Sequence, residues 1–164
     1  MNLKISPCLW FDNQAEEAAN FYVSIFPDSE VTAITRYSDA GNEIHGRPTG
    51  SVMTAEFTLA GQTFTALNGG PIFKLSEASS CQLECEDQRE IDYYWEKLGA
   101  DGDPGCQQCG WLKDKFGLSW QVVPKIMPLF FADHTSEKTR RAMNAMLGMK
   151  KLDIASLQDA YDGK

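Results

Sequence analysis

Residues 106–124 read CQQCGWLKDKFGLSWQVVP, and this stretch decides the fold. It predicts two strands joined by a tight turn, in which Gly117 suits a left-handed backbone conformation. An earlier strand at 80–86, SCQLECE, and a helix between them complete one unit. Asp87 followed by Glu90 predicts the start of that helix, because the Asp side chain accepts an unpaired backbone N–H. The apolar face of this helix recurs at helical spacing in Ile91, Tyr94, Trp95 and Leu98.

The first half of the chain shows the same order of elements. A strand at 4–11 precedes a helix, and Asn13 with Glu16 repeats the capping pattern. Pro27 ends the helix, since proline lacks the N–H that a helix interior needs. Asp87 lies 74 residues after Asn13, so we interpret the chain as an internal duplication whose second copy is shorter. Three further strands are predicted in the first copy, at 31–38, 51–60 and 62–68.

Two segments lie outside this repeat. The loop at 38–50 is long and rich in turn-forming residues, which makes it a candidate for a mobile flap. The tail at 125–164 is expected to pack on the duplicated core or on a partner chain. It predicts two helices, near 136–148 with Ser136 as cap and near 153–162 with Asp153 as cap. Its methionines are interpreted as core filling: Met143, Met146 and Met149.

Length and composition are those of an ordinary globular protein. The chain has 164 residues, of which 43% are hydrophobic and 23% charged. No apolar run reaches the roughly 18 to 20 residues of a membrane span, and the N-terminus does not resemble a signal peptide, so we expect a cytoplasmic protein without a membrane partner. The net charge is −8, and basic residues cluster only in the tail. A nucleic-acid partner needs a concentrated basic face and is therefore not expected.

The five cysteines favour reduced thiols, because their number is odd and their spacing sparse. Four of them give C-x3-C-x20-C-x2-C, which is close to a zinc-ribbon spacing. Cys81 and Cys85 lie on one predicted strand and would be about 13 Å apart, whereas zinc needs sulfurs within about 4 Å. A redox dithiol is also disfavoured, since Cys109 leads into a strand and not a helix. We interpret Cys109 as a small packed residue and Cys106 as incidental.

Motifs of common enzyme classes are absent from the sequence. The two histidines, His45 and His134, lie outside the predicted core strands, and neither position suggests the base of a serine or cysteine triad. No G-x-G-x-x-G occurs, and no glycine-rich strand–helix loop of the kind that binds S-adenosylmethionine is found. The faces of the strands are therefore the remaining candidates for a site.

Strand side chains alternate, so each predicted strand has two chemically distinct faces. On 80–86, Cys81, Leu83 and Cys85 are expected to pack against the helices, while the polar set faces the other side of the sheet. Trp120 and Gln121 likewise face opposite sides. Three tryptophans are either core anchors or walls of an apolar ligand pocket: Trp10, Trp111 and Trp120.

Four segments resemble one known family. They are KISPCLWFDNQAEEAANFYVSIFPDS (4–29), GSVMTAEFTLAGQTFTALNGGP (50–71), CGWLKDKFGLSWQVVP (109–124) and the tail pattern AMLGMKKLDIASLQDAY (145–161). These segments are similar to the PhnB-like family of the vicinal oxygen chelate superfamily, also called the glyoxalase/bleomycin-resistance superfamily. Many members of this family carry the name 3-demethylubiquinone-9 3-methyltransferase.

The resemblance implies an α+β fold of tandem βαβββ modules, whose curled mixed sheet forms a cup, usually in a homodimer. Module 1 would cover about 3–70 and module 2 about 79–124, within a single domain at 1–124, followed by a C-terminal helical extension at 125–164. Seven residues become candidates for ligand binding in the cup: Cys8, Trp10, Asn68, Gln82, Glu84, Trp111 and Gln121.

Metal-dependent relatives use one His or Glu from each of four cup strands. Carried over by resemblance, these positions fall near Ser6 or Pro7, near Phe64, near Cys81 or Gln82, and near Gln121. None of them is a histidine or a carboxylate, so we expect no metal and no cofactor. Glu84 is the nearby carboxylate that an alternative metal site would use.

Together these observations predict a protein that binds a small, partly apolar molecule in the cup, with an unknown reaction. Two alternatives stay open. One is a metal-dependent lyase or dioxygenase of the same superfamily that uses Glu84, Gln121 and a thiol. The other is the methyltransferase activity that the family name implies.

Overall fold

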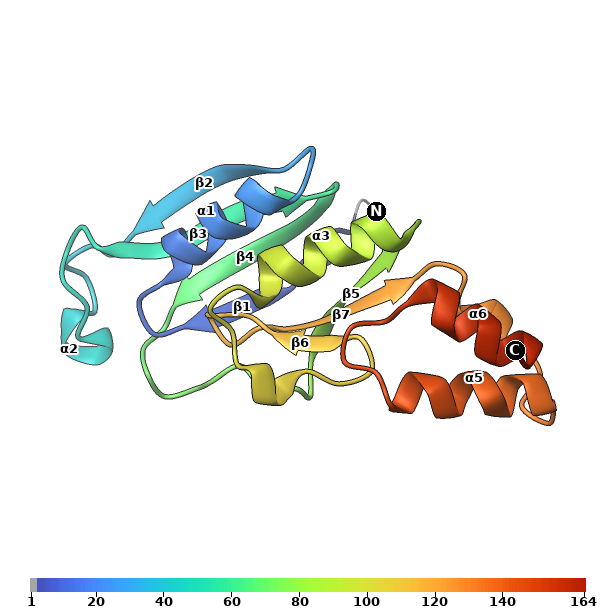
Figure 1. The fold of residues 1–164 in the computed structure, drawn as a ribbon. Coiled ribbons are helices and arrows are strands. Elements are labelled where there is room, and N and C mark those ends of the chain that lie inside the picture. The colour runs from blue at the N-terminus through green and yellow to red at the C-terminus, as the bar shows by residue number, and fades with distance from the viewer. Residues whose placement is uncertain (1–2) are drawn as a thin grey trace. The chain divides into compact units, whose positions relative to one another are not determined.

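The structure, a computed structural model, describes residues 3–164. The chain divides between Leu75 and Ser76 into two compact units, called unit 1 and unit 2 below. Each unit contains a mixed β-sheet, and unit 2 also contains the C-terminal helices (Figure 1). The predicted α+β class, with two mixed sheets followed by helices, is confirmed. Within the described residues, no helix is both long and apolar enough to cross a membrane.

Unit 1 is built on a four-stranded sheet in the order β1-β4-β3-β2. β1 pairs with β4 in parallel, and the other pairs are antiparallel. The loop predicted at 38–50 contains one short helix, α2, flanked by glycines with positive φ. The bounds in unit 1 are β1 Cys8–Phe11, α1 Ala15–Ile25, β2 Glu30–Arg36, α2 Asn42–His45, β3 Val52–Leu59 and β4 Gln62–Asn68.

The core of unit 1 lies between α1 and one face of this sheet. Tyr22 of α1 stacks on Phe57 with ring centroids 6.0 Å apart, and Phe57 stacks on Phe64 at 5.4 Å. The first strand is shorter than the predicted 4–11 and begins only after Pro7. Proline has no N–H for a ladder bond, which is consistent with a strand that starts after it.

The start of α1 corrects the predicted capping box. The helix begins at Ala15 after Gln14, and no side chain of the N-cap residue bonds to the first turn. The N–H of Ala15 instead donates to Oδ1 of Asn68, 2.8 Å away on β4. Sequence spacing can predict only caps from neighbouring residues, whereas this cap comes from a residue 53 positions further along the chain. Asn13 and Glu16 therefore do not define this helix start.

Unit 2 begins with a three-stranded sheet in the order β5-β7-β6 and a helix, α3. The predicted cap of α3 is confirmed: Asp87 accepts from the N–H of Glu90, and Glu90 accepts from the N–H of Glu86 at 2.8 Å. Two strands follow α3, as the sequence predicts, so the second repeat is βαββ within the described residues. The bounds are β5 Ser80–Cys85, α3 Gln88–Gly99, the 3-10 helix η1 Pro104–Cys106, β6 Trp111–Lys113 and β7 Ser119–Pro124.

The turn between β6 and β7 is organised by a buried carboxylate. Asp114 accepts hydrogen bonds from the backbone N–H groups of Phe116 and Leu118, at 2.9 and 3.0 Å. Its second oxygen accepts from Nε1 of Trp120 at 2.8 Å. Trp120 is therefore a core residue, one of the two roles predicted for it, and it ties the turn to β7.

The C-terminal helices form a second core within unit 2, and α5 and α6 lie side by side (Figure 1). Both predicted caps are confirmed, since Ser136 and Asp153 accept backbone N–H groups at the starts of α5 and α6. The bounds are α4 Met127–Phe130, α5 Glu137–Leu147 and α6 Ile154–Asp162. The buried cluster is Phe130, Ala142, Leu152 and Leu157, with Met146 and Met149 packed against it. Met143, predicted as core filling, is instead an exposed residue of α5.

Candidate functional site

Three side chains form a row across the sheet of unit 2. Gln82 on β5 pairs with Gln121 on β7, and Gln121 pairs with Trp111 on β6. Residues at paired positions share a face, and neighbouring strands are about 4.8 Å apart, so the row spans roughly 10 Å. The preceding position of β7, Trp120, points to the opposite, buried face. The predicted alternation of Trp120 and Gln121 is therefore confirmed.

This row opens into a cavity of about 350 Å³ that lies wholly within unit 2. Glu84, two residues beyond Gln82 on the same strand face, also lines it, so four of the seven predicted site residues are brought together. The cavity volume falls at the lower end of the range for small-molecule sites, about 300 to 1,000 Å³. The remaining lining is Cys109, Val123, Pro124, Lys125, Met127, Pro128 and Met146.

The cavity has a polar side and an apolar side. Two amide side chains and one carboxylate come from the strands, whereas methionine and proline side chains come from the segment after β7. Nε2 of Gln121 donates to Oγ of Ser80 at 2.8 Å, which fixes the amide and uses one of its two N–H donors. The side chain of Gln82 makes no hydrogen bond to any other described residue. The amide of Gln82 is therefore available to a ligand.

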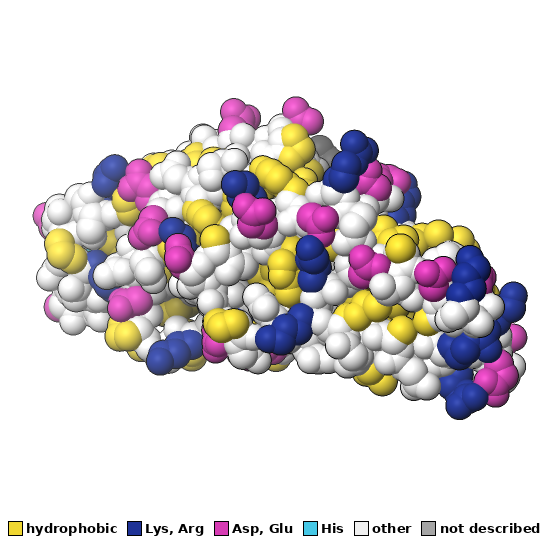
Figure 2. All heavy atoms as spheres, in the orientation of Figure 1, with side chains coloured by type: hydrophobic (Ala, Val, Ile, Leu, Met, Phe, Trp, Pro, Cys, Tyr) yellow, Lys and Arg dark blue, Asp and Glu magenta, His cyan; other side chains and the backbone are white. Residues whose placement is uncertain are grey.

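Lys125 adds a charged group at the edge of the cavity. Its ammonium contacts the carboxylate of Glu86, and this hydrogen bond raises the pKa of Lys125, with a smaller contribution from Glu84. The lysine therefore stays protonated and is already neutralised by Glu86. Glu84 leaves this cavity slightly negative, which favours neutral or cationic ligands over anions. On the face in Figure 2, acidic and basic side chains are interspersed, and Lys and Arg gather mainly over α5 and α6.

The other three predicted site residues lie in unit 1, where they have separate surroundings. Cys8 is exposed on β1, and burial of part of the thiol raises its pKa. Nε1 of Trp10 donates to the carbonyl of Gly70 at 2.8 Å. Asn68 is 6% exposed and lies on the face that α1 covers, together with Phe64. Its amide bonds to Ala15 and to the carbonyl of Val52, so the role that the contacts show is structural.

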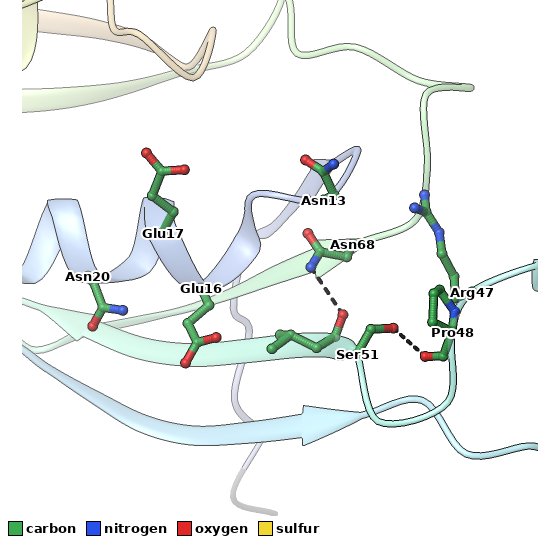
Figure 3. A pocket seen from close by; sticks show the side chains of 9 residues that line it. Asn13, Glu16, Glu17, Asn20, Arg47, Pro48, Ser51 and Asn68 are labelled. Carbon is green, nitrogen blue, oxygen red and sulfur yellow. Dashed lines mark hydrogen bonds between the residues drawn. The ribbon is translucent and has the colours of Figure 1, made fainter.

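Unit 1 has a cavity of its own, of about 650 Å³, between α1 and the segment after α2 (Figure 3). Polar side chains line it, including Glu16, Glu17 and Arg47. Arg47 is paired with Asp12 at 3.2 Å, and Asn68 already bonds within the protein, as the dashed line in Figure 3 shows. Apart from Pro48 and Val52 its lining residues are polar, whereas the cavity of unit 2 has an apolar wall, and we place the candidate site in unit 2.

The residues do not fit the metal site of the metal-dependent relatives. Phe64, one of the positions carried over by resemblance, is buried against Phe57 under α1. Gln121 offers a neutral amide, which is a weak ligand for transition metals. In the part of the chain that the structure describes, no three His, Cys, Asp or Glu side chains group closely enough to hold a metal ion. We therefore derive no step through a metal.

The thiols of the C-x-x-C pair have different surroundings. Cys106 ends the short helix η1, and its Sγ lies 3.5 Å from a carboxylate oxygen of Asp103. Desolvation and this hydrogen bond raise the pKa of Cys106, which lowers its reactivity at neutral pH. Cys109 has a positive φ of 52° and lines the cavity. Cys109 is thus part of the wall of the cavity.

Sequence reasoning missed Val123 on β7 and the wall that follows this strand. Val123 was within reach, because it lies two residues after Gln121 on the same strand face. Met127, Pro128 and Met146 were not, since no strand alternation relates a tail segment to a sheet. The only signal was the separate apolar run at 126–131.

Comparison with known proteins places the chain in a family. Residues 3–123 match the family described as 3-demethylubiquinone-9 3-methyltransferase. The chain belongs to this family. The match ends before the tail, so the resemblance noted for 145–161 lies outside it. No curated protein matches the chain.

Solved structures agree with this assignment. A PhnB protein of Bacillus cereus is 37% identical, with a TM-score of 0.63 over 74% of this chain and 99% of the other. A Pseudomonas aeruginosa protein is 20% identical, with a TM-score of 0.59 over 76% and 98% of the two chains, and this likeness concerns the fold alone. The chain therefore has the PhnB-like fold, and about a quarter of it lies outside the likeness to the Bacillus cereus protein.

Proposed function

We propose that this member of the 3-demethylubiquinone-9 3-methyltransferase family binds one small, partly apolar molecule in the cavity of unit 2. The observation that carries the proposal is the row of Gln82, Gln121 and Trp111 beside a cavity of about 350 Å³ with an apolar wall. Ligand sites combine mainly apolar lining with a few fixed polar groups in this way. An uncharged aromatic molecule with one hydrogen-bonding group matches the amides, the indole and the slight negative charge.

A calorimetric titration with ethyl 4-hydroxybenzoate at neutral pH tests this proposal. This ester is neutral, carries one hydroxyl and fits the volume of the cavity. We expect saturable binding with one ligand per chain. Trp111→Leu should weaken it at least tenfold, because an indole that the ligand covers is a typical centre of binding energy. Gln82→Leu should weaken it about three- to tenfold through one lost hydrogen bond.

Gln62→Leu is the matched control, since Gln62 is also an exposed strand glutamine but lies in unit 1. Its affinity should equal that of the wild type. The proposal fails if the wild type gives no saturable heat, or if Trp111→Leu and Gln82→Leu bind as the wild type does. Circular dichroism of each variant shows whether the fold is kept.

The methyl transfer in the family name would need both a donor and an acceptor molecule. In that reaction a methyl group passes from the sulfonium of S-adenosylmethionine to a hydroxyl oxygen, which loses its proton. A cavity of about 350 Å³ accommodates one small molecule, not this pair. The cavity of unit 2 therefore does not fit the donor together with a quinone. Calorimetric titration with S-adenosylmethionine tests this alternative, and measurable binding would favour a methyltransferase activity.

We further infer that the chain is a member of the vicinal oxygen chelate superfamily and acts as a cytoplasmic homodimer. The repeat of strand, helix and strands in the two units supports the superfamily. Large apolar side chains on the surface of unit 1, such as Ile72 and Phe73, support a partner chain. Unit 1 and unit 2 would form the single domain predicted up to residue 124, with the helices as an extension.

A further inference from the structure

We propose that the C-terminal extension, residues 125–164, determines which ligands the cavity of unit 2 accepts. In this proposal, which rests on the binding function proposed above, Met127 and Met146 contact the apolar part of the ligand. The row of Gln82, Gln121 and Trp111 holds its polar end. The extension is thus a specificity wall of the site as well as a stabilising segment.

The lining of the cavity shows that the extension reaches the site at two separate places. Met127 and Pro128 belong to α4, immediately after β7, whereas Met146 lies near the end of α5. Both methionines are half-buried and pack against the core cluster of Phe130, Ala142, Leu152 and Leu157. Each side chain therefore has one side fixed by the protein and another that faces the cavity.

Hydrogen bonds fix the extension beside the sheet. The N–H of Cys109 donates to the carbonyl of Met149 at 2.9 Å, and the N–H of Gly110 donates to that of Lys150 at 2.8 Å. Nε2 of Gln108 donates to the carbonyl of Leu147 at 2.7 Å. The segment after α5 is therefore bonded to the loop that leads into β6. Because Cys109 also lines the cavity, the same contacts set the position of both walls.

A second group of hydrogen bonds holds the start of α6 in place. The amide of Gln88 on α3 donates to the carbonyl of Leu152 at 3.1 Å and accepts from the N–H of Ile154 at 2.9 Å. Leu152 is fully buried, and a Cβ on Gly110 would lie 2.9 Å from its side chain. This close approach shows that the extension packs tightly against the residue that precedes β6.

The extension lies outside the region that defines the family. The family match ends at residue 123, and 74% of this chain suffices to cover 99% of the Bacillus cereus PhnB protein. The polar row belongs to the matched region, whereas Met127 and Met146 follow it. Methionine side chains are flexible and polarisable, so they adapt to apolar groups of different shape. The extension therefore supplies apolar contacts that the matched region alone does not contain.

A series of alkyl esters of 4-hydroxybenzoic acid tests this proposal with the full-length chain. Methyl, ethyl, propyl and butyl esters keep the same polar end and lengthen only the apolar part. In the wild type, we expect each added methylene to tighten binding roughly three- to fourfold in calorimetric titrations. In Met146→Gln and in Met127→Gln, this gain should fall below about twofold per methylene, because a polar amide replaces the apolar contact.

Two controls accompany these variants. Met143→Gln carries the same substitution on the same helix at an exposed position outside the cavity, and it should keep the wild-type gain per methylene. Met146→Leu keeps an apolar side chain and should keep it as well. Met127 lies on a different helix from Met146, so loss of folding in one variant leaves the other to decide.

The outcomes separate this inference from the proposed function. If Met127→Gln and Met146→Gln both keep the full gain per methylene, the extension does not select ligands, while binding through Trp111 and Gln82 stands. If the wild type binds none of the esters, the proposed function fails and the inference fails with it. A methyl ester that binds the Gln variants within about threefold of the wild type, combined with the lost gain for longer esters, supports the inference.

Discussion

Asp114 is the residue on which the hairpin of β6 and β7 depends. It is 3% exposed, and its carboxylate accepts hydrogen bonds from two backbone N–H groups and from the indole of Trp120. Asp114→Ala leaves these donors buried without partners, and we expect the free energy of unfolding to fall by about 3 kcal/mol. Urea denaturation followed by circular dichroism measures the change.

Asp39→Ala is the matched control, because Asp39 is an exposed aspartate in the loop of unit 1. It should change the free energy of unfolding by less than about 0.5 kcal/mol. Equal losses in the two variants would show that the three bonds of Asp114 do not stabilise the fold. Since β6 and β7 also carry Trp111 and Gln121, ester binding should weaken in Asp114→Ala before the protein unfolds.

Cys85 makes the stability of unit 2 decrease at high pH. Its pKa is raised to about 12, mainly because burial disfavours the thiolate, with Glu90 and Asp87 adding to the effect. The unfolded chain ionises this thiol near its ordinary pKa of 9.0, whereas the folded chain keeps it protonated. The stabilising contribution is therefore complete below about pH 9 and is lost as pH rises from about 9 to about 12.

Comparison of the wild type with Cys85→Ala isolates this effect from other groups that titrate at high pH. We expect the free energy of unfolding of the wild type to fall more steeply between about pH 8 and about pH 11 than that of the variant. Urea denaturation at a series of pH values provides the measurement. Parallel pH profiles in the two proteins would be inconsistent with a buried, protonated thiol.

At the scale of elements, the start of α1 shows what local patterns cannot predict. The Asn13–Glu16 spacing indicates a capping box, yet the structure uses Asn68 from β4. Asn68→Ala should lower the free energy of unfolding by about 1 to 2 kcal/mol, because it removes a helix cap and the bond to Val52. Asn13→Ala should cost less than about 0.5 kcal/mol. Urea denaturation measures both losses. A larger loss in Asn13→Ala would contradict this prediction and support a helix cap formed by Asn13.

The helices and strands themselves were largely predictable, for a physical reason. Asp87, Ser136 and Asp153 cap helices through side chains that bond within three residues, so the signal and the bond lie in the same stretch. Strand alternation on β7 also separated Trp120 from Gln121, since it depends only on neighbouring residues. The length of β1 was overestimated because apolar residues continue before Pro7 in the sequence without pairing.

The packing of the extension at the start of β6 depends on Gly110. It has a φ of +84°, and an added Cβ would lie 2.9 Å from both Leu152 and the carbonyl of Val122. Gly117 has a similar φ of +89° but open space around it, so Gly117→Ala isolates the backbone cost, about 1 kcal/mol. Gly110→Ala should cost about 2 to 4 kcal/mol, because steric overlap adds to it.

Thermal or urea denaturation of the two alanine variants measures this difference. Gly110→Ala should also weaken binding of the butyl ester more than that of the methyl ester, because it displaces the extension at Leu152. If the two variants lose the same stability, the contact between Gly110 and Leu152 does not hold the extension in place.

At the scale of the whole molecule, the candidate site was predictable only in part. Strand alternation and the family resemblance place Gln82, Glu84, Trp111 and Gln121 on one face, and the four side chains do line one cavity. Asn68 was grouped with them, but its side chain lies on the face that α1 covers, since alternation alone does not say which face a helix will cover. Met127 and Met146 depend on how the extension packs, which no spacing in the sequence encodes.

The proposed homodimer predicts the mass of the protein in solution. Ile72 and Phe73 are 76% and 62% exposed, and Phe73 lies edge-on against Trp10 with ring centroids 5.0 Å apart. Exposed apolar groups of this kind mark protein contacts. Sedimentation equilibrium should therefore give about 37 kDa, twice the chain mass of 18.3 kDa.

Ile72→Glu should shift this mass toward the monomer, because a charge buried at an interface without a partner is strongly unfavourable. Ile44→Glu is the control: Ile44 is 86% exposed on α2. It should leave the mass unchanged if the interface includes the group of Ile72, Phe73 and Trp10. A wild-type mass near 18 kDa at micromolar concentration would exclude a stable homodimer. If only Ile44→Glu lowered the mass, the interface would include α2 and not the group of Ile72.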